Sequence, residues 1–212
     1  MLAEFDFTIL ATVNALLNSV AFVEAVQAAD ALADPPARLD GYSAARGLAG
    51  DRPDVRSRRR ALLDERESQT VDAWFAQVEG MKSDRPGEAL ELIGVIEKHP
   101  VAGKSPALPR ITGLGDYLDN MSLGLELLAG GVQFADAASL FRSAEEKATE
   151  QADKDVARRR LAETGRAWMT ELRRMASEAP DDDAYFEVLR GLEEYGRTLD
   201  VTREQALEDL RR

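Results

Sequence analysis

Apolar side chains recur along the chain at intervals of three and four residues, the spacing of one face of an α-helix. The strict alternation of apolar and polar residues that marks a half-buried strand is nearly absent. The pattern therefore predicts an all-α protein, either an irregular helical bundle or a short α-solenoid-like array, of about seven or eight helices. After a first helix, the predicted helices cover residues 54–82, 88–98, 116–129, a stretch from 134 to 177 broken at most once, 185–199, and a last segment that follows Thr202.

The first predicted helix carries the most apolar face of the chain. Residues 7–23 contain no charged side chain. One helical stripe collects Phe5, Ile9, Val13, Leu16, Leu17, Val20 and Val23. We expect this face to be buried in the protein's own core. The alternative is a membrane anchor, because the run is close to spanning length and arginines follow it. Glu4 and Asp6 argue against a secretory signal peptide, which needs a basic start.

Prolines, glycines and capping residues mark the expected helix ends. Asp34-Pro35-Pro36 cannot continue the first helix, and residues 34–53 read as a long loop or short turns. Residues 101–113 are also loop-like. Other end signals predict a helix stop at Gly130-Gly131, an N-cap at Asp181, and a capping box formed by Thr202 and Gln205.

Two segments of the chain resemble each other at an offset of 94 positions. The matched pairs are Thr70/Thr164, Ala73/Ala167, Trp74/Trp168, Val78/Leu172, Met81/Met175, Ser83/Ser177, Asp84/Glu178 and Pro86/Pro180. Beyond the proline the second segment has two extra residues, after which Ile96 corresponds to Leu192. The pattern predicts a duplicated unit of helix, turn and helix, in which each Trp anchors its own hairpin.

A unit of this kind resembles one helical hairpin of HEAT-like and related α-solenoid proteins, in the stretch from Trp74 to Tyr117. The resemblance implies a binding surface rather than a catalytic centre. Solenoid repeats follow one another at shorter intervals than the offset seen here, so an irregular bundle is favoured. We expect a single all-α domain over residues 1–212, with halves 1–131 and 132–212 that each contain one hairpin.

Composition narrows the classes of partner and chemistry. The 212 residues carry a net charge of −12, which disfavours nucleic acid and anionic lipid and favours a basic protein surface. The chain has no cysteine, which excludes disulfides and thiolate metal sites and fits a cytoplasmic location. Its one histidine, His99, excludes a multi-histidine metal site, and its place at a helix end favours a capping or surface role.

Acidic pairs offer one candidate for chemistry. Glu88-x-x-Glu91 and Glu150-x-x-Asp153 each place two carboxylates on one helix face. The pattern is similar to that of all-α nucleotide pyrophosphohydrolases, which hold magnesium with such pairs, although in that family the pairs lie on closely successive helices. A magnesium-dependent nucleotide hydrolase is therefore an alternative, and it requires Glu88, Glu91, Glu150 and Asp153 to converge.

Arginine triplets offer a second candidate. Residues 58–60 and 158–160 could clamp a phosphate or an acidic peptide, but such runs more often form solvated faces paired with neighbouring acids. On the first of these helices, arginines could also pair with acids one turn later, as Arg60 could with Asp64.

We expect a non-enzymatic interaction or scaffold protein without a cofactor. It would bind another protein through a groove or an acidic face. The candidate contact residues lie on a weakly apolar stretch and are Glu145, Glu146, Glu150 and Asp153. An immunity or inhibitor-type factor that neutralises a basic partner is the alternative among binding proteins.

Overall fold

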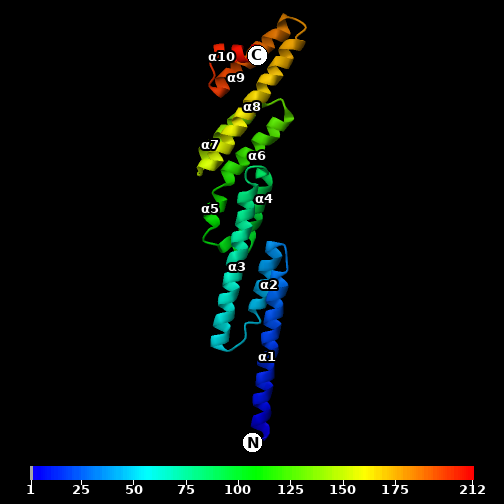
Figure 1. The fold of residues 1–212 in the computed structure, drawn as a ribbon, viewed down its shortest axis with the longest axis vertical. Coiled ribbons are helices and arrows are strands. Elements are labelled where there is room, and N and C mark those ends of the chain that lie inside the picture. Colours follow the sequence, from blue (N-terminus) through cyan, green and yellow to red (C-terminus); the bar gives the residue numbers. More distant parts are fainter. Residues whose placement is uncertain (1) are drawn as a thin grey trace. The chain divides into compact units, whose positions relative to one another are not determined.

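The computed structural model describes the backbone of residues 2–212 and the side chains from residue 11 onward (Figure 1). The predicted all-α class is confirmed, since the described residues contain helices and no strand. All of the α-helices except α5 are at least nine residues long. Their bounds are α1 Leu2–Asp30, α2 Pro35–Arg46, α3 Pro53–Met81, α4 Pro86–Lys98, α5 Leu108–Thr112, α6 Gly115–Gly130, α7 Phe134–Lys147, α8 Gln151–Glu178, α9 Asp182–Leu199 and α10 Arg203–Arg211, with a 3-10 turn at Ala102–Lys104.

The chain folds into two compact units. The first unit comprises Met1–Glu79 and Gly94–Leu108, and the second comprises Gly80–Ile93 and Pro109–Arg212. Helices α3 and α4 therefore contribute residues to both units. The expected single domain with halves 1–131 and 132–212 stays a prediction.

In the first unit, α2 packs along the C-terminal half of α1 (Figure 1). The two helices approach closely at Gly41, where an added Cβ would lie 2.8 Å from the Cβ of Ala29. Helix α2 corrects the expectation that residues 34–53 form loops. Asp34 caps α2 by accepting a hydrogen bond from the backbone N–H of Ala37 at 3.2 Å, and Pro35 occupies the first helical position. The residues that end α1 therefore also start the next helix.

The apolar stripe of α1 is not buried, which corrects the expectation of a core helix. Among its described members, Val13, Leu16, Leu17, Val20 and Val23 are between 46% and 62% exposed. Phe5 and Ile9 lie outside the residues whose side chains are described. The side chains of α1 that enter the core are Phe22, Val26 and Ala29. No helix in the part of the chain that the structure describes is long and apolar enough to cross a bilayer.

In the second unit, α6, α7 and α8 lie side by side, and α9 and α10 pack on α8 (Figure 1). The core of this region is built around the Trp168 indole. It contains Phe134, Trp168, Met169, Leu172, Val188, Leu192, Tyr195 and Ala206. Helices α6 and α7 meet at Gly124, because only hydrogen there leaves room for the ring of Phe141.

Both of the segments predicted to be twins are helix–turn–helix, formed by α3 and α4 and by α8 and α9. With the offset of 94, all but one of the buried positions of α3 fall on buried positions of α8. These pairs are Leu63/Ala157, Thr70/Thr164, Val71/Gly165, Trp74/Trp168, Phe75/Met169 and Val78/Leu172. A duplicated building block would produce this agreement, and the duplication itself stays a prediction.

Candidate functional site

The four acids expected to contact a partner lie around the junction of α7 and α8. Glu145 accepts a hydrogen bond from Arg158 Nε at 2.6 Å, and Glu146 is exposed. Glu150 is exposed and occupies the N-cap position of α8. Asp153 differs from the others because it is only 1% exposed. In this unit, therefore, Glu146 and Glu150 are open to a partner, whereas Asp153 belongs to the interior.

Asp153 forms a buried ion pair with Lys82. The Nζ atom of Lys82 lies 2.9 Å from a carboxylate oxygen of Asp153 and 3.3 Å from Oε2 of Glu150. The hydroxyl of Tyr117 is buried and has no hydrogen-bond partner among the described residues. Burial, helped by the Asp153 carboxylate, raises the pKa of Tyr117 to about 12. The arrangement joins the end of α3 to the start of α8 and is suited to holding them together.

The acids of the magnesium-hydrolase alternative do not form a metal-binding group. Glu88 pairs with Arg85 at 3.0 Å, and Glu91 is exposed. The Lys82 ammonium occupies the place between the other two acids where that alternative requires a cation. No group of three or more histidines or acids placed to hold a metal ion occurs within the described side chains.

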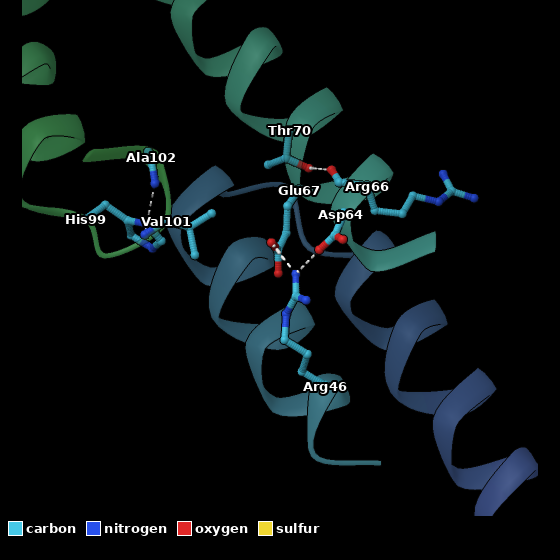
Figure 2. Close-up of polar contacts among 8 residues, drawn as sticks. All are labelled: Arg46, Asp64, Arg66, Glu67, Thr70, His99, Val101 and Ala102. Carbon is cyan, nitrogen blue, oxygen red and sulfur yellow. Dashed lines mark hydrogen bonds and ion pairs between the residues drawn. The ribbon is translucent and has the colours of Figure 1, made fainter. Parts of the chain in front are cut away.

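A second polar cluster lies inside the first unit, where Arg46 of α2 reaches α3 (Figure 2). Its Nη2 atom lies 2.6 Å from Asp64 Oδ1 and 2.6 Å from Glu67 Oε2. These two acids raise the pKa of Arg46 above its ordinary value. Asp64 is thus bound by Arg46 of another helix, and no ion pair between Asp64 and Arg60 occurs among the described side chains. The cluster ties α2 to α3.

His99 has a structural place in the first unit (Figure 2). Its Nδ1 atom accepts from the backbone N–H groups of Val101 and Ala102, at 3.3 and 3.4 Å. Nε2 lies 3.6 Å from Asp40, and the ring meets Trp74 edge to face. His99 therefore caps the turn that follows α4 rather than the end of α4, the helix end that the sequence pattern indicated. The side chain is only 8% exposed, so the alternative surface role is wrong.

The second unit has an open groove of about 750 Å³ along one face of α8. Helix α8 contributes most of the lining residues, which follow one another at helical spacing. Helices α9 and α10 form one side of the groove. The lining residues are Arg158, Leu161, Ala162, Gly165, Arg166, Met169, Thr170, Arg173, Tyr195, Leu199 and Asp209. Gly165 lets α9 approach the floor, since a Cβ there would lie 2.9 Å from Leu199 Cδ1. Apolar lining residues such as Met169 and Tyr195 are buried, whereas the lining arginines are exposed, so the groove has an apolar floor.

Three arginines give the groove a basic edge. Arg158 is held by Glu145, and Arg173 donates to the backbone carbonyl of Asp209, from Nε at 3.2 Å. Arg166 is exposed and forms no ion pair with any described side chain. Asp209 is the one acid in the lining. The edge is thus positively charged on a chain whose net charge is −12.

Sequence reasoning missed this groove. The arginine triplet at residues 158–160 does not indicate it, but the spacing of Arg158, Arg166 and Arg173 places these three on one face of the helix. That face could therefore be predicted from the sequence. The side of the groove made by α9 and α10 could not be predicted from the sequence, because it depends on tertiary packing.

Known proteins add no further constraint on this site. No protein-family model, no curated protein and no solved structure matches the chain. The resemblance to HEAT-like hairpins thus stays an expectation from the residues alone. The evidence on function is the geometry of the groove and of the polar clusters.

Proposed function

We propose that the chain is a non-enzymatic protein-binding protein whose groove along α8 receives an acidic amphipathic helix of a partner. The observation that carries the proposal is the combination of an apolar floor with three arginines at the edge of one open groove. Helices bind in grooves of this kind by laying apolar side chains on the floor and pairing their charges at the rim.

The spacing of the arginines defines the partner helix. Arg158, Arg166 and Arg173 lie eight and seven residues apart on α8, which corresponds to about 12 and 10 Å along the helix axis. A partner helix that runs alongside α8 would therefore carry acids about two turns apart, with apolar residues between them. Its contact would extend over about four turns, or roughly 22 Å.

Replacing Arg166 should weaken partner binding more than replacing either of the other two arginines. No described acid pairs with Arg166, whereas Arg158 already pairs with Glu145. A carboxylate from a partner would form a charge-assisted, bidentate pair with Arg166 without breaking an existing one. The exposed acids Glu146 and Glu150 lie outside the groove lining and would not compete for it.

A defined peptide tests the proposal. The probe is a labelled helical peptide of about 18 residues, with leucines on one face and glutamates about two turns apart, and binding is followed by fluorescence anisotropy. We expect saturable binding whose affinity falls as salt is added. The substitution Arg166→Glu should lower this affinity about tenfold. Arg190→Glu on α9 makes the same change in charge outside the groove lining and should leave binding unchanged.

Two outcomes count against the proposal. One is equal weakening by both substitutions, which would indicate general electrostatics rather than a site. The other is preferential binding of the matching peptide with lysine in place of glutamate. That result would favour the immunity or inhibitor-type alternative, in which the acidic surface meets a basic partner.

A further inference from the structure

The first unit carries an apolar face that no described residue of that unit covers. It is formed by Val13, Leu16, Leu17, Val20 and Val23 of α1, each of them 46% exposed or more. At 100° per residue, this face lies on the side of α1 opposite Phe22, Val26 and Ala29, which dock on the unit. Contiguous apolar patches on the surface of a soluble protein are often interaction sites.

We propose that a second copy of this chain covers this face, so that α1 pairs with α1 in a homodimer. The spacing of the apolar residues supports this pairing. Val13, Leu16, Val20 and Val23 follow one another at three, four and three residues, the seam of a two-stranded coiled coil. Valine at positions 13 and 20 with leucine at 16 is the combination of β-branched and Leu seam residues that favours two strands. A twofold interface also needs a self-complementary surface, and a seam meeting its own copy provides one.

Charge selects a second copy over a lipid surface. Helices that lie on membranes carry Lys and Arg on their polar face. Residues 1–37 contain neither, and the chain carries a net charge of −12. An anionic bilayer would therefore repel α1. Pairing of two α1 helices meets no such repulsion at the seam, because residues 7–23 have no charged side chain.

The size of the face sets the expected strength. Five apolar side chains from each copy form a smaller contact than the roughly 20–30 residues a side of a standard interface. The dimer should therefore dissociate on dilution rather than be obligate. The proposal is independent of the α8 groove, since α1 and α8 belong to different units and Arg166→Glu leaves the seam unchanged.

Sedimentation equilibrium over a concentration series tests the proposal, with one substitution in the seam and a matched one outside it. Leu16→Asp introduces an acid into the seam, and Asn14→Asp introduces one on another exposed side of α1. We expect wild type and Asn14→Asp to dimerise and Leu16→Asp to remain monomeric. Leu16 is 62% exposed, so the substitution should not unfold the unit, and circular dichroism checks this.

A disulfide provides a second readout, because the chain has no cysteine of its own. In a parallel pair the two residues 16 face each other across the seam, so Leu16→Cys should then form an intermolecular disulfide under mild oxidation, and Asn14→Cys should form much less. A monomeric wild type at every concentration would overturn the proposal. So would unchanged dimerisation of Leu16→Asp, or a monomer that binds phosphatidylcholine–phosphatidylglycerol vesicles through Leu16.

Discussion

The indole of Trp74 and the imidazole of His99 meet edge to face, with ring centroids 5.7 Å apart and planes inclined at 76°. In the second unit Trp168 and Tyr195 meet with nearly the same geometry, at 5.6 Å and 77°. The register that aligns Ile96 with Leu192 also aligns His99 with Tyr195. The correspondence between the hairpins thus includes the ring that each Trp contacts, which supports the proposed duplication.

Replacing either partner ring should destabilise its hairpin. We expect Tyr195→Leu to lower the free energy of unfolding by about 1 kcal/mol, because an aromatic pair contributes about that much beyond its buried area. His99→Leu should cost about 2 kcal/mol, since it also removes the cap on Val101 and Ala102. Guanidinium unfolding followed by Trp fluorescence measures both values. A larger loss for Tyr195→Leu than for His99→Leu would contradict this account of the cap.

Two buried tyrosines should respond in opposite ways to loss of their hydroxyls. The Tyr117 hydroxyl has no described partner, so Tyr117→Phe should raise the free energy of unfolding by about 1 kcal/mol. The Tyr42 hydroxyl donates to the Asp30 carboxylate, so Tyr42→Phe should lower it by about 1–2 kcal/mol. Urea unfolding of both variants tests the pair. Equal destabilisation by the two substitutions would show that Tyr117 has a hydrogen bond this account lacks.

The pKa of Tyr117 predicts a loss of stability in alkaline solution. In the folded chain it is raised from 10.0 to about 12. Between these values the unfolded chain has lost the phenol proton while the folded chain keeps it, so rising pH favours unfolding. The stability that depends on the protonated Tyr117 hydroxyl is fully present below pH 10 and is lost as pH rises towards about 12. Tyr117→Phe should therefore show a shallower decline over this range in urea unfolding at a series of pH values. Parallel declines for both proteins would contradict the assignment.

The buried pair of Lys82 and Asp153 should behave differently from a surface pair. Lys82→Met leaves a buried carboxylate without its cation and should cost about 3–5 kcal/mol. Adding Asp153→Leu to it should recover most of that loss, because neither charge then remains buried. Lys147→Met removes the exposed pair with Asp116 and should cost less than about 1 kcal/mol. Chemical unfolding of the three variants measures these losses of stability. Similar losses for Lys82→Met and Lys147→Met would refute a structural role for the buried pair.

Local signals in the sequence predicted helix ends well. Gly131 has the left-handed conformation expected of a helix stop, and Asp181 accepts from the backbone N–H of Ala184 at 2.9 Å. Thr202 and Gln205 form the predicted capping box. These features depend only on residues within a turn of one another, so the sequence contains all the information they need.

Expectations that depended on distant packing were less successful. The apolar stripe of α1 predicted burial, but periodicity shows only that a face is apolar and not what covers it. Asp34-Pro35-Pro36 was read as the start of a loop, although the same residues also begin a helix. Asp153 was read as a contact residue, because its partner Lys82 is distant in sequence. The α8 groove likewise depends on walls from two later helices.

A charge-swap cycle tests the central claim, that the α8 groove binds an acidic helix, most directly. Four affinities are measured by fluorescence anisotropy: wild type and Arg166→Glu, each with the glutamate peptide and with the same peptide carrying one lysine at the position that faces residue 166. We predict that each single change weakens binding about tenfold and that the two changes together restore it. Losses that simply add, with no recovery in the doubly changed pair, would contradict the claim that the peptide lies in this groove.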